Sequence, residues 1–150
     1  MLEKQIEQDL KAALLGGDQL KVQTLRGLKS ALLYLKVEKG KRDTGLSEEE
    51  EISVLSKEAK KRQESADLFL KGGNEEKAHA ELEEKKIIEN YLPEQLEEED
   101  IKKIIATEIV SLGADKPSDM GKVIAAVKEK TAGAADGGTI ARMVKEQLGQ

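Results

Sequence analysis

The sequence contains no cysteine among its 150 residues. This absence excludes disulfides, thiolate catalysis and any zinc site with cysteine ligands, and it fits a reducing compartment. Aromatic residues make up only 2%, so a core must be built from Leu, Ile, Val and Ala. Long hydrophobic runs are also missing, because acids interrupt the apolar pattern of the opening stretch "MLEKQIEQDLKAALL". We therefore expect no signal peptide, no membrane contact and a cytoplasmic location.

Apolar residues at helical spacing dominate the pattern that remains. The stretch from Leu25 to Leu35 repeats leucine at intervals of three and four, which places these side chains on one stripe of a helix. No segment shows the alternation typical of a β-strand. The sequence thus predicts an all-α fold. The first four helices are expected over Leu2–Leu15, after Asp18, from Ser47 to Gly72, and over about Asn74–Asn90.

Several residues indicate where the helices begin. Asp18 is expected to cap the second helix, and Ser47 with Glu50 forms the pattern of a capping box for the third. The acids from Glu48 to Glu51 would interact favourably with the positive N-terminal end of that helix dipole. The fourth helix is highly charged and less clearly patterned, so we expect it to be largely exposed while leaning on its neighbours.

The stretch "YLPEQLEEED" is the best domain boundary. Pro93 lacks a backbone donor and disfavours helical angles at Leu92, so we place the junction between residues 1–92 and residues 93–150. Three short helices are predicted after it, and they should share a small core. Their apolar residues are Ile101, Ile104, Ile105, Ile109 and Leu112; Met120, Val123, Ile124 and Val127; and Ile140, Met143, Val144 and Leu148.

The net charge of −5 argues against a protein that coats nucleic acid by bulk electrostatics. The acidity lies in residues 46–100, which carry eight Lys or Arg and eighteen Asp or Glu, whereas both ends are mildly basic. A cluster of basic residues more often forms a solvated face. Two such clusters are nevertheless candidate contacts for RNA phosphates. With few aromatics to stack on bases, such contacts would follow backbone shape rather than sequence. The candidates are Arg26, Lys29 and Lys36 on the second helix, and Lys122, Lys128, Lys130, Arg142 and Lys145 on the last two.

The glycine-rich stretch "GAADGGT" precedes the last predicted helix and raises the question of a phosphate-binding loop. It lacks both the lysine and the preceding strand of a P-loop. Asp136 stands instead where an N-cap accepts from amides of the first turn, and its charge would repel a phosphate. We interpret the stretch as a turn followed by a cap. Contact of the free helix amides with one anion is the alternative.

No catalytic, cofactor or metal site is expected. His79 is the only histidine and has no evident serine or second histidine beside it, so we expect a solvated surface residue. The acids from Glu94 to Asp100 lack the spacing of a calcium loop, and a solvated helix start explains them better.

Five stretches together resemble the GatB/YqeY family and, within it, the free-standing YqeY-like proteins. They cover nearly the whole chain in order, and "YLPEQL" and "DMGKV" are the most specific because helix periodicity demands neither. Gly121 and Lys122 match the second of these motifs, and Gly133, Asp136, Val144 and Lys145 match the terminal one. The chain departs from the family at Ala134 and Gly138, where basic residues are frequent, and at Ala141, where asparagine is common. The five stretches are "LRGLKSAL", "EAKKRQESADLF", "YLPEQL", "SDMGKVIAAV" and "GAADGGTIARMVKEQL".

The resemblance implies two helical domains, the second similar to the tail domain of the B subunit of glutamine-dependent aminoacyl-tRNA amidotransferase. In that enzyme the tail helps to hold tRNA, while amide transfer occurs in parts that this chain lacks. The family is commonly classed with carbon–nitrogen ligases that use glutamine as amido-N donor, and we interpret this class as inherited.

Two functions follow as hypotheses. The first is a non-catalytic module that binds tRNA or a tRNA-dependent enzyme through the basic residues named above. The second is a protein–protein adaptor whose acidic third and fourth helices bind a basic partner. Independent amide transfer is the least favoured, because no nucleophile-and-base set is apparent.

Overall fold

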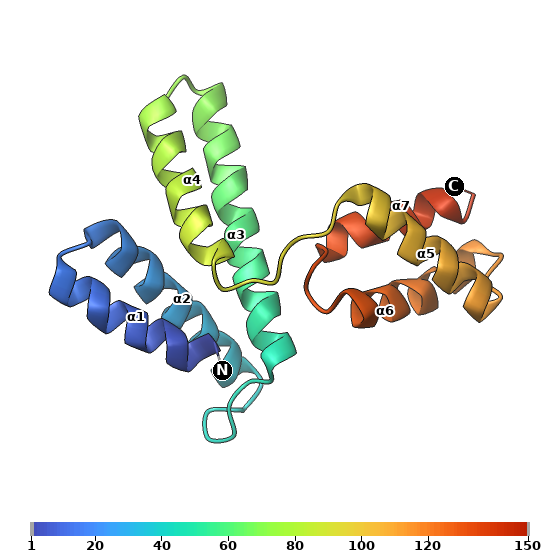
Figure 1. The fold of residues 1–150 in the computed structure, drawn as a ribbon, viewed down its shortest axis with the longest axis horizontal. Coiled ribbons are helices and arrows are strands. Elements are labelled where there is room, and N and C mark those ends of the chain that lie inside the picture. Colours follow the sequence, from blue (N-terminus) through green and yellow to red (C-terminus); the bar gives the residue numbers. More distant parts are fainter. Residues whose placement is uncertain (1, 150) are drawn as a thin grey trace. The chain divides into compact units, whose positions relative to one another are not determined.

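Residues 2–149, which the computed structural model describes, form seven α-helices and one 3-10 helix, with no β-strand in that range (Figure 1). The predicted all-α fold is therefore confirmed. None of these helices is long and apolar enough to cross a membrane. The helices are α1 (Leu2–Gly16), α2 (Gln19–Glu38), α3 (Glu48–Lys71), α4 (Glu75–Glu89), α5 (Glu98–Leu112), η1 (Pro117–Asp119), α6 (Met120–Thr131) and α7 (Gly137–Gln147).

The internal contacts divide the chain into two compact units, Met1–Leu92 (unit 1) and Pro93–Gln150 (unit 2). Unit 1 holds α1 to α4, and unit 2 holds α5 to α7 with η1. That these two units are separate domains stays a prediction.

The core of unit 1 is built around the inner stripe of α2. Leu25, Leu28 and Leu32 are fully buried, which confirms the stripe that the leucine spacing predicts. Helices α1, α3 and α4 pack against it, and Leu46 closes it from the loop before α3. The buried members are Ile6, Leu10, Leu25, Leu28, Leu32, Leu46, Val54, Leu55, Ala59 and Ile88.

Helices α3 and α4 form an antiparallel hairpin whose far end extends beyond α1 and α2 (Figure 1). Only Val54, Leu55 and Ala59 of α3 belong to the main core. Farther along, Ala66 and Ala78 are buried between the two helices, and small side chains there let the helices approach closely. This part of the hairpin is only two helices thick (Figure 1).

Unit 2 has its own core between α5, α6 and α7. Most residues predicted for this core are buried or partly buried. The prediction that Leu112 belongs to the core is wrong, because Leu112 is 48% exposed. It is the last residue of α5, directly before the left-handed Gly113 that ends the helix, and its side chain falls outside the packed face. The buried members are Ile101, Ile105, Val123, Val127, Ile140, Met143, Val144 and Leu148.

The predicted helix caps are confirmed. Asp18 accepts from the Lys21 amide, and Ser47 and Glu50 form a complete capping box. Glu51 has a role beyond the expected interaction of this acidic run with the helix dipole. Its side chain is 2% exposed, and its carboxylate accepts the Leu2 amide at the start of α1 at 3.1 Å. One acid of the run thus connects α3 to α1.

The "YLPEQL" motif is fastened at both ends. Tyr91 and Leu92 pack on the core of unit 1, whereas Leu96 packs on the core of unit 2. The Leu96 amide also donates to the carbonyl of Ala134 at 2.8 Å, and Gln95 Nε2 donates to the carbonyl of Gly133 at 3.1 Å. The motif therefore has a structural explanation, because its first residues pack on the core of unit 1 and its last residues pack on the core of unit 2.

Tyr91 fixes the end of unit 1 to its beginning. Its hydroxyl donates to the carboxylate of Asp9 on α1, 82 positions away in the chain. Burial, together with this bond to an acid, raises the pKa of Tyr91 well above its ordinary value. The hydroxyl therefore stays protonated and able to donate over the whole physiological pH range.

Tyr91→Phe should lower the free energy of unfolding by about 1–2 kcal/mol, because it removes a hydrogen bond to a carboxylate while keeping the ring. Chemical denaturation measures the effect. Tyr34→Phe is the matched control, since Tyr34 is 74% exposed and surface changes of this kind alter stability by less than about 0.5 kcal/mol. Equal effects of the two variants would contradict a stabilising role for the Tyr91 hydroxyl.

Candidate nucleic-acid interface

The five candidate basic residues of unit 2 fall into two groups, and the first group is paired with acids within the unit. Arg142 on α7 lies 2.6 Å from Glu98 at the start of α5 and 3.2 Å from Glu146. Attraction to Glu98 is the main cause that raises the pKa of Arg142. Lys130 on α6 pairs with the buried Glu108 of α5 at 2.7 Å. Both cations therefore join helices to α5.

The second group is exposed and unpaired. Lys122, Lys128 and Lys145 have no carboxylate partner among residues 2–149. Lys122 and Lys128 are six residues apart on α6, so they lie about 120° apart around its axis. Between them the exposed face carries the small residues Gly121 and Ala125 and, beside Lys128 in the chain, the exposed acid Glu129. This face of α6 thus presents two flanking ammonium groups, with small residues and one acid between them.

The packing of this fold does not require a glycine at position 121. A Cβ at that position would meet no atom within 4 Å, and the residue is exposed inside a helix. Glycine in a helix costs roughly 0.5–1 kcal/mol relative to alanine. The sequence match of Gly121 to the family motif is therefore not explained by the packing of unit 2.

Lys128 marks where α6 approaches α7. A Cβ at Gly137, the first residue of α7, would lie 3.3 Å from Lys128 Cε and 3.5 Å from its Nζ. The lysine is exposed nonetheless, and its charge stands beside the start of the helix that carries Lys145.

The three predicted cations of α2 are not equivalent. Lys36 lies 2.6 Å from Glu3 of α1 with its side chain only 14% exposed, so its charge is committed to helix packing. Lys29 is 3.7 Å from Glu7, a longer contact between half-exposed side chains. Arg26 is exposed and has no partner in the described chain. One uncommitted charge offers little to a ligand that carries many phosphates.

The glycine-rich stretch before α7 is a turn and a cap. Asp136 Oδ2 accepts from the Thr139 amide at 3.1 Å, which confirms the expected N-cap. Gly137 and the residue after it already belong to α7, while Gly133 has a φ of +89° and turns the chain. The carboxylate of Asp136 occupies the helix start, so an anion would have to approach against it.

The motif "EAKKRQESADLF" contains a network that the sequence pattern does not reveal. Arg62 on α3 donates to Glu58 at 2.9 Å and to Glu84 of α4 at 2.9 Å. Its Nη2 also lies 3.5 Å from where a Cβ would stand at Gly27. The spacing of Glu58 and Arg62 could have indicated the first contact, since residues four apart face each other on a helix. Nothing local indicated Glu84, which is buried.

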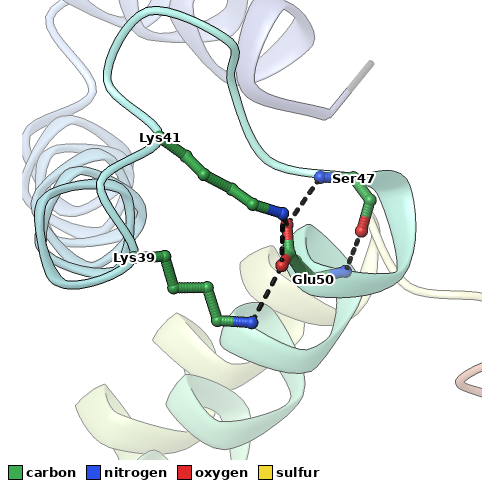
Figure 2. Close-up of polar contacts among 4 residues, drawn as sticks. All are labelled: Lys39, Lys41, Ser47 and Glu50. Atoms are coloured by element: carbon green, nitrogen blue, oxygen red, sulfur yellow. Dashed lines mark hydrogen bonds and ion pairs between the residues drawn. The ribbon is translucent and has the colours of Figure 1, made fainter.

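A second network fixes the loop between α2 and α3 (Figure 2). Glu50 accepts from Lys39 Nζ and Lys41 Nζ, each at 2.8 Å, and from the Ser47 amide at 2.8 Å. The bonds from the two lysines, followed by the one from Ser47, lower the pKa of Glu50 from 4.5 to about 2. Two basic residues of the "KGKRDTG" loop are thereby neutralised within the fold.

Glu50→Gln keeps an acceptor for the capping box but loses the attraction to both lysines. Because the folded-state pKa of Glu50 is about 2 against an ordinary 4.5, its ionisation stabilises the fold above pH 4.5 and less as the pH falls towards 2. The variant should therefore be less stable at pH 7 and approach the wild type near pH 2. Thermal melts across this range measure the gap. Glu49→Gln is the control, and a gap that does not depend on pH would contradict the assignment.

The remaining titratable features show no built site. His79 is 75% exposed beside Glu83, as expected for a surface residue. Within residues 2–149 no group of three or more His, Asp or Glu side chains is placed to hold a metal ion.

The fold and this distribution of charge define an all-helical protein of two compact units, with exposed unpaired lysines on the second. The chain belongs to the family described as "Yqey-like protein", whose model matches residues 3–148. The resemblance to free-standing YqeY-like proteins is thereby confirmed. No curated protein sequence matches the chain.

Proposed function

We propose that this protein is a non-catalytic module that binds tRNA, by itself or in complex with a tRNA-dependent enzyme. The observation that carries the proposal is that three of the five predicted cations of unit 2, Lys122, Lys128 and Lys145, are exposed and have no carboxylate partner among residues 2–149. Ammonium groups without an internal carboxylate are the ones available to replace counterions on a phosphate backbone. The absence of a side chain at Gly121 leaves room for a backbone to approach α6 there.

The choice of tRNA rests on the resemblance of the terminal motifs to the amidotransferase tail domain. Neutralised cations such as Arg142 contribute less, because a phosphate would have to compete with Glu98 and Glu146. The interface we propose is therefore narrower than the full set of basic residues in unit 2.

The test is tRNA binding by the whole protein at increasing salt. Three phosphate contacts predict that the logarithm of the association constant falls with the logarithm of salt concentration with a slope of roughly −2 to −3. The triple change Lys122→Ala, Lys128→Ala and Lys145→Ala should weaken binding at least tenfold and flatten the slope. The control removes three exposed lysines from unit 1, Lys4, Lys11 and Lys57. No binding at low salt, or equal loss in both triple variants, would refute the proposal.

A protein adaptor is the second candidate, and the end of the α3–α4 hairpin favours it. Leu68 and Leu70 are 68% and 51% exposed there, close in sequence to the exposed acids Glu75 and Glu76. A basic protein partner with an apolar contact would match this surface. A partner that is captured after nuclease treatment, and is lost in Glu75→Lys with Glu76→Lys, would support the adaptor. Capture that nuclease abolishes would support tRNA instead.

A further inference from the structure

Helix α2 presents a second stripe, on the side away from the core of unit 1. Its residues are spaced alternately by four and three, the spacing with which two helices pack along a seam. The end nearer Glu38 is apolar: Leu33, Tyr34 and Val37 are 48%, 74% and 56% exposed. The other end is polar, and a small residue, Ser30, lies between them. The members of this outer stripe are Gln19, Gln23, Arg26, Ser30, Leu33 and Val37, all exposed.

The polar end of the outer stripe borders an open hollow between the end of α1 and the start of α2. Ala13, Leu14 and Val22 give it apolar walls, and Gln23 and Arg26 form its edge on the stripe. Leu14 is 50% exposed there. One helix thus carries protruding apolar side chains at one end and an apolar-walled hollow at the other.

We propose that the outer stripe binds the same stripe of a second copy of this chain, with the two α2 helices antiparallel about a two-fold axis near Ser30. A two-fold interface requires a surface that complements itself, and this stripe meets the requirement. Rotation about Ser30 places Tyr34 of one copy across from Arg26 of the other, and Val37 across from Gln23. The protruding apolar side chains then cover the hollow of the opposite copy.

The charges favour the same arrangement. Arg26 and Glu38 are both exposed and have no partner among residues 2–149. Antiparallel pairing brings the guanidinium of Arg26 over the ring of Tyr34 and towards Glu38, one turn farther along the second copy. Parallel pairing would instead set Arg26 against Arg26. Ser30 at the crossing allows the helix axes to approach to about 8–9 Å.

The interface is limited to one helix pair of about 30 Å length and the adjoining hollow, so it lies at the small end of specific interfaces. The dimer should therefore depend on concentration. Sedimentation equilibrium should show the mass rising from 16.4 kDa towards twice that value as the protein approaches millimolar concentration. A mass that stays at the monomer value throughout would overturn the proposal.

Cysteine crosslinking tests the geometry, because the chain has no cysteine of its own. Ser30→Cys places two thiols at the two-fold axis and should give a disulfide-linked dimer under mild oxidation. Gln8→Cys, at an exposed position of α1, is the control and should crosslink at least tenfold more slowly. Gln23→Cys distinguishes the two directions: it should crosslink slowly in an antiparallel pair and rapidly in a parallel one. Rapid crosslinking at position 23, or no preference for position 30, would overturn the antiparallel arrangement.

Exchanging the charges of Arg26 and Glu38 tests the register of the two helices. Arg26→Glu and Glu38→Arg should each raise the dimer dissociation constant at least tenfold, and the double variant should restore most of the loss. Failure of the double variant to recover would remove the Arg26–Glu38 pairing and with it the proposed register. These changes leave the unit 2 lysines intact, so loss of the dimer and loss of tRNA binding are separate results.

Discussion

Replacing Leu28 with alanine should lower the stability of unit 1 by about 3 kcal/mol, and Ile105→Ala should do the same to unit 2. Both side chains are fully buried, each in a different core. Truncation removes apolar contacts and leaves a cavity that a helical core closes only in part. Stability is measured by denaturant unfolding of the full chain.

The distribution of aromatic residues allows the two units to be followed separately. Tyr34, Phe69 and Tyr91 are the only aromatic residues, and all three belong to unit 1. Tyrosine fluorescence therefore reports on unit 1, whereas far-ultraviolet circular dichroism reports on both. If the units are independent domains, Ile105→Ala shifts the dichroism transition and leaves the fluorescence transition in place. A fluorescence transition that moves with Ile105→Ala would show that the two units unfold together.

Arg62→Met should destabilise unit 1 by about 3 kcal/mol. The guanidinium is 17% exposed, and it neutralises Glu58 and Glu84, whose side chains are 14% and 12% exposed. Methionine keeps much of the volume but leaves two poorly solvated carboxylates without a cation. The far half of the α3–α4 hairpin, which is only two helices thick, should be the first part to open. Hydrogen exchange of amides in α3 beyond Ala66 would detect this opening.

Lys61→Met is the matched control for Arg62→Met. Lys61 precedes Arg62 and also contacts Glu58, but its side chain is 67% exposed. Exposed ion pairs contribute about 0–1 kcal/mol, so the control should change little. A second variant, Arg62→Met with Glu84→Leu, should recover part of the loss because it removes one of the unpaired acids. Equal effects of Arg62→Met and Lys61→Met would contradict the role of the network.

For the proposed tRNA binding, variants of the unpaired cations are more informative than variants of the cations that pair with acids. Alanine at Arg142 or Lys130 would both remove a charge and loosen a contact with α5, so a loss of tRNA binding would have two explanations. Changes at Lys122 and Lys145 remove charge alone. Among the basic residues of unit 2, position in the sequence does not distinguish these two kinds.

The sequence determined the helices, their inner faces and their caps, because these depend on the helical repeat and on hydrogen bonds within a few residues. The leucine stripe of α2 and the capping box at Ser47 are examples, and both are confirmed. Leu112 is the exception, since its side chain lies at the end of α5, where the repeat no longer specifies a packed face.

Only the tertiary structure decided which charges are neutralised and which acids are buried. Arg142 meets Glu98 across 44 positions, Lys36 meets Glu3 across 33, and Glu51 caps α1 from α3. Such contacts require side chains from different helices to converge, and each residue by itself looks like any other on a solvated helix. Local pattern specifies the elements because its interactions are short in sequence; the chemistry left at the surface is specified by how those elements pack.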